Sequence, residues 1–187
     1  MTPSLLVRHL PALAATLGFV GLIALGARVD VAVPGSPVPQ SLQTLAVLAA
    51  GLTLGPRWGL AAGLLYLAAG ALGMPVFAGG ASGASAISGP TVGYLVGFPL
   101  AALLVGAGSR ALSPRPMWRT MLLGFGLGLA GHLLILALGW AGLSVRIGAA
   151  EALSAGVTPF LWGMAVKSAA LALSASLLLA LRDRLNI

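Results

Sequence analysis

Long apolar segments, divided by proline, glycine and arginine, constrain this chain more than any other feature of its sequence. We predict six membrane spans, at residues 11–28, 41–55, 58–73, 91–108, 117–143 and 157–181. Only 7% of the residues are charged, whereas a soluble domain carries about a quarter. The sequence therefore predicts an all-α integral membrane protein, a single six-helix transmembrane domain over residues 1–187, with little chain left for a soluble domain.

The local sequence predicts how the second and third spans are connected and that the first span is retained. The spans 41–55 and 58–73 are shorter than the ~20 residues that a simple span needs. The turn Gly55-Pro56-Arg57-Trp58 separates them. Because proline interrupts a helix interior, we expect a hairpin of two short or tilted helices rather than one long helix. The span 11–28 is expected to be a retained helix, since no clear small-residue cleavage site precedes the later spans.

The arginines predict the orientation of the spans. A cytoplasmic N-terminus leaves only Arg28 and Arg146 in outer loops. Cytoplasmic segments are enriched in Lys and Arg, so both termini are predicted to be cytoplasmic. The net charge of +7 follows the connecting segments, so we predict no nucleic-acid-binding face. The arginines assigned to the inner side are Arg8, Arg57, Arg110, Arg115, Arg119, Arg182 and Arg184.

Two outer connections have an unusual composition. Residues 29–40 contain three prolines, and residues 74–90 are uncharged and rich in Gly, Ala and Ser. Long loops in compact folds are often functional, and irregular backbone is tolerated beside a membrane where protein covers it. We therefore expect both loops to fold back as lids over a cavity; the alternative is that they are flexible linkers.

Lys167 is the only lysine, and it lies in the apolar run 156–181, at least roughly 15 Å from either end at 1.5 Å per helical residue. An ammonium at a bilayer centre costs roughly 2.5–3.5 kcal/mol on insertion scales. We therefore interpret Lys167 as a hydrogen-bond donor and countercharge in a polar ligand cavity. The three acidic residues, Asp30, Glu151 and Asp183, lie near ends or in loops. The partner of the lysine is then a ligand oxygen, a loop acid that folds inward, or backbone carbonyls.

Three further side chains complete the expected ligand site. Gln43 begins the second span, and its amide both donates and accepts hydrogen bonds; helix capping is the alternative. Phe77 and Tyr94 are expected to supply an apolar wall with one hydroxyl, or else to be ordinary interfacial aromatics. His132, in the fifth span, is expected to bond a neighbouring carbonyl rather than to relay protons. We predict no catalytic residues, cofactor site or metal site.

Several longer motifs are specific to a known family. They are Gly35-Ser36-Pro37-Val38-Pro39-Gln40-Ser41-Leu42-Gln43-Thr44, Leu54-Gly55-Pro56-Arg57, Gly73-Met74-Pro75-Val76-Phe77-Ala78-Gly79-Gly80, Ser88-Gly89-Pro90-Thr91-Val92-Gly93-Tyr94, and Thr158-Pro159-Phe160-Leu161 with Gly163 and Lys167. In these motifs, and over nearly its whole length, the chain resembles BioY, the biotin-specific substrate-binding (S) component of energy-coupling factor (ECF) transporters.

The resemblance implies a six-helix S-component fold in a bacterial or archaeal cell membrane. It also implies high-affinity capture and uptake of biotin, as transported ligand rather than cofactor, through the residues Gln43, Phe77, Tyr94 and Lys167. The implied partners are biotin, the lipid bilayer, and an ECF coupling transmembrane subunit with ABC-type ATPases, or a homo-oligomer if the protein works alone. The chain departs from the family where Met164 replaces an acid before the lysine.

Two alternatives to a coupled transport subunit remain at this point. A stand-alone vitamin facilitator would need no ATPase module. A rhomboid-like intramembrane serine protease is suggested by the Gly-x-Ser-Gly pattern at residues 80–83. That pattern precedes a helix rather than opening one, and His132 lies in the fifth span rather than the last, so we expect no enzyme.

Overall fold

The computed structural model describes residues 5–112 and 116–185, and this part of the chain is almost entirely helical. Helices α1 and α2 flank a short antiparallel ladder in which Asp30 of β1 pairs with Ser41 of β2. The elements in order are α1 (Leu5–Gly26), β1 (Asp30–Val31), β2 (Gln40–Ser41), α2 (Gln43–Ala71), the 3-10 turn η1 (Ala78–Gly80), α3 (Gly83–Ile87), α4 (Val92–Gly108), η2 (Ser109–Leu112), α5 (Met117–Ile147), α6 (Ala149–Gly156), η3 (Thr158–Phe160) and α7 (Leu161–Leu185).

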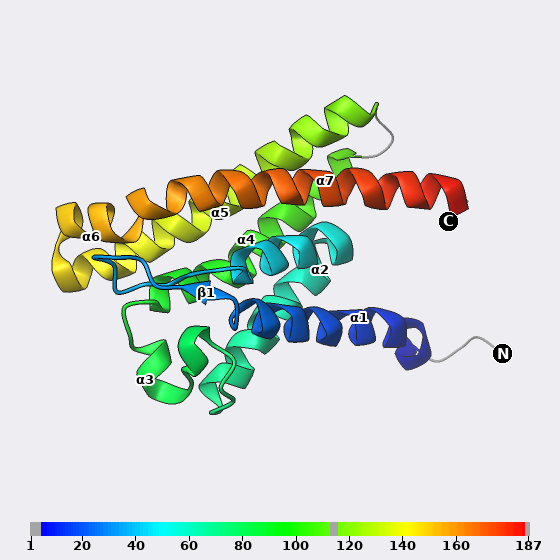
Figure 1. Cartoon of the computed structure of the whole chain (residues 1–187). Coiled ribbons are helices and arrows are strands. Elements are labelled where there is room, and N and C mark those ends of the chain that lie inside the picture. The colour runs from blue at the N-terminus through cyan, green and yellow to red at the C-terminus, as the bar shows by residue number, and fades with distance from the viewer. Residues whose placement is uncertain (1–4, 113–115, 186–187) are drawn as a thin grey trace.

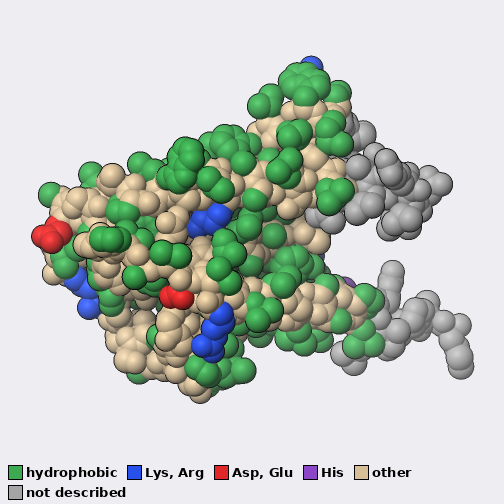
Figure 2. Space-filling model, viewed as in Figure 1, with side chains coloured by type: hydrophobic (Ala, Val, Ile, Leu, Met, Phe, Trp, Pro, Cys, Tyr) green, Lys and Arg blue, Asp and Glu red, His purple; other side chains and the backbone are tan. Residues whose placement is uncertain are grey.

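Within the described residues, five segments are long and apolar enough to cross a membrane. Their outward faces are apolar as well as their cores: Leu25 is 64% exposed and Trp162 is 80% exposed. Figure 2 shows hydrophobic side chains over much of the visible face, with few charged ones. A helix that is apolar all round fits a lipid environment, and the predicted all-α membrane architecture is confirmed at this level. The five segments are His9–Gly26, Gln43–Ala71, Val92–Leu112, Met117–Ile147 and Ala149–Leu177.

Helix α2 folds back on itself. Its backbone leaves helical geometry at Gly55, where φ is 79° and ψ is −178°, a conformation that side-chain-bearing residues rarely adopt. A Cβ built at Gly59 would lie 2.7 Å from the Cα of Gly51. In a straight helix, residues eight apart are about 12 Å apart. The two limbs, 43–54 and 56–71, therefore run past one another, and the break lies in the predicted turn.

Glycines bring α2 and α4 into backbone contact. A Cβ at Gly63 would lie 2.6 Å from the Cα of Pro99, and one at Gly106 would lie 2.6 Å from the carbonyl carbon of Gly55. Small residues permit such close approach between membrane helices. Helix α4 also packs on α5, where Gly97 faces Ile135. The helices thus pack in the order α1, α2, α4, α5 and α7 (Figure 1).

The helix bounds differ from the predicted spans in several places. Helix α1 begins at Leu5, so Pro11 lies inside it instead of starting it. Helix α5 continues to Ile147, and Gly148, with φ 87°, turns the chain into the separate helix α6. The last predicted span is divided into η3 and α7. Among the arginines used to predict orientation, Arg115 and the side chains of Arg8, Arg182 and Arg184 lie outside what the structure describes.

Candidate functional site

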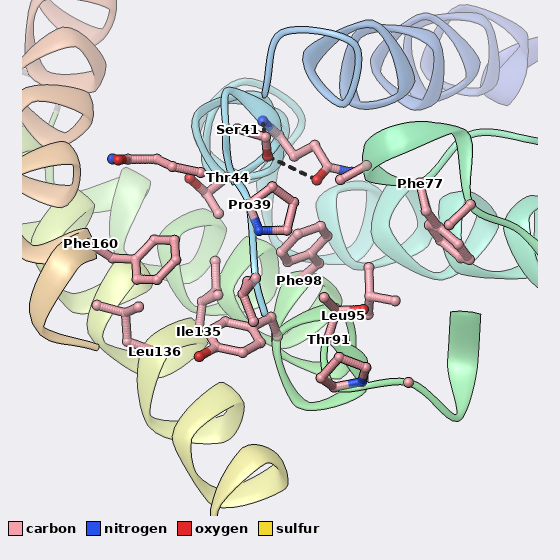
Figure 3. A pocket seen from close by; sticks show the side chains of 18 of the residues that line it. Pro39, Ser41, Thr44, Phe77, Thr91, Leu95, Phe98, Ile135, Leu136 and Phe160 are labelled. Carbon is pink, nitrogen blue, oxygen red and sulfur yellow. Dashed lines mark hydrogen bonds between the residues drawn. The ribbon is translucent and has the colours of Figure 1, made fainter. Parts of the chain in front are cut away.

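A cavity of about 340 Å³ lies among segments that are distant in the sequence. Its wall comes from the end of the β1–β2 connection, the start of α2, the segment 77–91, α4, the middle of α5, η3 and α7. In Figure 3, Phe160, Ile135 and Leu136 form one apolar side, and Leu95 and Phe98 lie across from them. Cavities of this size hold small organic ligands.

The four residues predicted for the ligand site all line this one cavity. Gln43 comes from the start of α2, Phe77 from the segment before η1, Tyr94 from α4 and Lys167 from α7. Both loops that were expected to act as lids also contribute wall residues. The structure therefore brings the four predicted residues together in the wall of one cavity.

Lys167 is half-buried, and its ammonium donates a hydrogen bond to the backbone carbonyl of Ser41, with Nζ and O 3.1 Å apart. Among the described residues no Asp or Glu lines the cavity, and Met164, one turn earlier on α7, is apolar. Asp30 and Glu151 are exposed, so neither loop acid folds inward. An ammonium has three N–H donors, and only one is used by this carbonyl. The cavity thus carries a positive charge without a protein carboxylate beside it.

Gln43 lines the cavity but makes its hydrogen bonds within the protein. Its side chain is 4% exposed. The Ser41 hydroxyl donates to Oε1 at 2.9 Å, as drawn in Figure 3, and Nε2 donates to the Tyr66 hydroxyl. Tyr66 in turn donates to the carbonyl of Val76 at 3.0 Å. The amide therefore links the start of α2 to the segment that carries Phe77, and it does not cap the helix.

The role of Tyr66 is not evident from the sequence. The residue is fully buried, and its ring meets Phe77 edge-on at 5.4 Å and stacks near Phe98 at 6.2 Å. The available signal was a hydroxyl-bearing aromatic in an otherwise apolar third span. Buried tyrosines usually find a hydrogen-bond partner, but the sequence does not say which partner.

Tyr94 presents its ring to the cavity, while its hydroxyl links α4 to α6. The ring packs against Gly139 and lies 6.4 Å from the ring of Phe160. The hydroxyl donates to the carbonyl of Gly156 at 2.7 Å. Tyr94 thus ties α4 to the end of α6, and its hydroxyl is engaged before any ligand arrives.

Removing this hydroxyl should be felt as a loss of stability. Tyr94→Phe leaves the buried carbonyl of Gly156 without this donor, so we expect the free energy of unfolding to fall by about 1–3 kcal/mol. Thermal unfolding of the purified protein in detergent measures the change. Ser174→Ala is a matched control, because it removes an exposed hydroxyl that bonds within its own helix. Equal stability of Tyr94→Phe and wild type would contradict this role.

His132 lies in a polar cluster on the cavity wall. Its Nδ1 is 2.8 Å from the carbonyl oxygen of Gly128 and 3.1 Å from the hydroxyl of Ser168, and its Nε2 is 3.2 Å from the hydroxyl of Thr44. The carbonyl contact is of the kind expected from the sequence. Ser82, the serine of the protease-like pattern, is not among these partners; the serine that contacts His132 is Ser168.

Arg28 and Arg146, the two arginines predicted to lie in outer loops, contact the segment 74–90 near its two ends. Arg28 donates to the carbonyl of Pro75 at 2.7 Å, and Arg146 donates to the carbonyl of Ser88. Between these points lie η1 and α3, which supply cavity wall residues. Interactions of charged groups with carbonyls are stronger than neutral hydrogen bonds. This segment is therefore fixed at both ends.

Comparison with known proteins decides the family. A sequence model described as the BioY family matches residues 1–184. This chain belongs to the BioY family. A Pyrococcus horikoshii protein named "Probable biotin transporter BioY" is 39% identical over 151 residues, which cover 81% of this chain and 85% of the relative. A Thermotoga maritima protein named "Biotin transporter BioY" is 35% identical over 158 residues, which cover 84% of this chain and 89% of the relative.

A solved structure establishes the fold of this BioY chain. A crystal structure described as the S-component for biotin from an ECF-type ABC transporter superposes with a TM-score of 0.82. The match covers 95% of this chain and 94% of the other, at 22% sequence identity. The predicted S-component-like fold is confirmed. Membership of a transporter family also confirms the prediction that the protein is not an enzyme.

Proposed function

We propose that this BioY protein binds biotin in the cavity and acts as the substrate-binding subunit for biotin uptake. The names of its relatives support the substrate. The observation that carries the proposal is the Lys167 ammonium, which stands in a mostly apolar cavity with no carboxylate among the described wall residues. Such a site favours a monoanion with a large apolar part.

The chemistry of biotin matches these groups. Its carboxylate is the natural partner for the free N–H donors of Lys167. Its thiophane ring and aliphatic chain suit the apolar side formed by Phe160, Ile135 and Leu136. Its ureido group both donates and accepts hydrogen bonds and needs polar partners when buried. Gln43, Phe77 and Tyr94 are proposed as further wall residues of this site.

Six membrane crossings with both termini in the cytoplasm fit this function best. The N-terminal end of α1 and the C-terminal end of α7 lie at the same end of the molecule, as an even number of crossings requires (Figure 1). Counting the two limbs of α2 separately gives six apolar passes. With the outer arginines Arg28 and Arg146 beside the segment 74–90, the cavity would open to the outside of the cytoplasmic membrane.

A coupling subunit with ABC-type ATPases is the proposed partner. Ala14 and Gly18 are exposed on α1, and the neighbouring Leu13 and Leu17 are exposed as well. Small residues on an exposed membrane helix suit close contact with another helix. The alternative is a protein that works without ATPases, alone or as a homo-oligomer.

Reconstitution separates these two possibilities. Liposomes that contain only this protein are expected to bind radiolabelled biotin without accumulating it in the lumen, because the chain has no nucleotide-binding motif. Protein-free liposomes are the control for passive entry. Saturable uptake of biotin into the lumen without ATPase subunits would favour the facilitator, and absence of any binding would overturn the proposed substrate.

A further inference from the structure

The cluster around His132 fixes how one part of the cavity can form hydrogen bonds. His132 is 3% exposed, and its Nδ1 lies 2.8 Å from the carbonyl oxygen of Gly128. A carbonyl oxygen only accepts, so Nδ1 must carry the proton. The cavity wall holds the Lys167 ammonium and, among the described residues, no carboxylate, which favours a neutral imidazole. In a neutral imidazole the other nitrogen, Nε2, is a pure acceptor.

This tautomer determines the direction of the next hydrogen bond. Nε2 lies 3.2 Å from the Thr44 hydroxyl oxygen. Because Nε2 only accepts, Thr44 must donate its single hydroxyl proton to it. Thr44 is half-buried and lines the cavity (Figure 3). Its remaining lone pairs are then available to the cavity, so Thr44 acts toward a ligand as an acceptor only.

The cavity therefore has opposite hydrogen-bonding characters at two places. The ammonium of Lys167 can only donate. Thr44, held by His132, can only accept. Both groups line the same cavity, and the Lys167 ammonium bonds the carbonyl of Ser41, three residues before Thr44 on the chain. A ligand that satisfies both must bring an acceptor or anion to one place and an N–H or O–H donor to the other, because an unpaired polar group in an apolar site is costly.

We propose that Thr44 is a specificity-determining residue that accepts a hydrogen bond from a ligand N–H, and that His132 is the positioning residue that imposes this role. The inference rests on the proposed function, in which that donor is a ureido N–H of biotin. The ordered chain runs from the ligand N–H to Thr44, from Thr44 to Nε2, and from Nδ1 to the carbonyl of Gly128. Ser168, fully buried at 3.1 Å from Nδ1, holds the ring in the same orientation.

The test compares biotin with two analogues, each methylated at one ureido nitrogen. Wild type should bind one of these isomers at least about tenfold more weakly than biotin, because that isomer lacks the N–H that Thr44 accepts. Thr44→Val keeps the shape of the side chain but removes the acceptor. This variant should bind biotin more weakly than wild type by a similar factor. Its affinities for biotin and for that isomer should be nearly equal.

Three further variants complete the test. Thr44→Ser keeps the hydroxyl and should retain the preference. His132→Phe frees the Thr44 hydroxyl to rotate and donate. The preference for biotin over the methylated isomer should therefore fall, even if thermal unfolding shows that the variant is still folded. Thr53→Val is the matched control on α2, since Thr53 is exposed and outside the cavity wall.

Each outcome has a definite meaning. If wild type binds biotin but Thr44→Val keeps the full preference against methylation, the discrimination is steric and the inference is wrong. If wild type binds both isomers as tightly as biotin, Thr44 reads no ureido N–H and the inference is again wrong. If wild type does not bind biotin at all, the proposed function itself fails, and isothermal titration of wild type alone reveals this.

Discussion

Lys167→Ala should bind biotin at least about a hundredfold more weakly than wild type. The substitution removes the cation that offsets a buried ligand carboxylate, and leaving one member of a buried ion pair alone costs about 3–5 kcal/mol. Ligand binding measured by isothermal titration calorimetry in detergent tests the prediction. Arg110→Ala is the control, because Arg110 is an exposed cation outside the cavity wall.

The loss should concern the ligand and not the fold. Lys167 donates a hydrogen bond to a backbone carbonyl of the protein, and its charge is disfavoured by the apolar surroundings. Lys167→Met, which keeps an apolar stem, is therefore expected to unfold at a temperature no lower than that of wild type. Wild type should also prefer biotin to its neutral amide, and this preference should disappear in Lys167→Met. Unchanged biotin affinity in both variants would remove the central claim about this residue.

Gly63→Ala should destabilise the protein strongly although it adds only one methyl group. The new Cβ would lie 2.6 Å from the Cα of Pro99, so the backbones of α2 and α4 must separate. Overpacking of this kind costs about 1–3 kcal/mol, and Gly63→Leu is expected to prevent folding. The midpoint of thermal unfolding in detergent measures the effect.

Gly126→Ala is the matched control on α5. A Cβ built at Gly126 meets no atom of the described structure within 4 Å. Because alanine favours helix over glycine by up to about 1 kcal/mol, this variant should be as stable as wild type or slightly more so. Equal stability of Gly63→Ala and Gly126→Ala would mean that the α2–α4 contact is looser than described. Since α2 carries Thr44 and α4 carries Tyr94, a wider separation should also weaken ligand binding.

The sequence was sufficient to predict much of the fold. The long apolar runs predicted the membrane helices, because a soluble domain with so many apolar residues would need many more charged residues on its surface. The turn at 55–58 was visible because Pro56 interrupts a helix interior and Gly55 readily adopts the non-helical backbone that a turn needs. The separate helix α6 was not predicted, because its boundary depends on a positive φ at Gly148 within otherwise helix-forming sequence.

The site was predictable by residue type but not by contact. Lys167 was identified because a buried cation requires a reason, and it does line the cavity. Its partner, the carbonyl of Ser41, belongs to backbone that any residue supplies, so no sequence pattern marks it. The same holds for Gln43 and Tyr66, which form a hydrogen bond between the two limbs of α2. Hydrogen-bond partners between distant segments follow from packing, and a single sequence does not encode that packing locally.

The fold-back of α2 also has a consequence for the lipid around the protein. The limb 43–54 is about 18 Å long at 1.5 Å per residue, well short of a hydrocarbon layer of about 30 Å. Helix α5, with 31 residues, is about 46 Å long. A difference between helix length and bilayer thickness is accommodated when the lipids beside the helix stretch or compress, or when the helix tilts. We therefore expect the bilayer to be thinner beside α2 than beside α5, so that the membrane is locally thinned on one side of the protein.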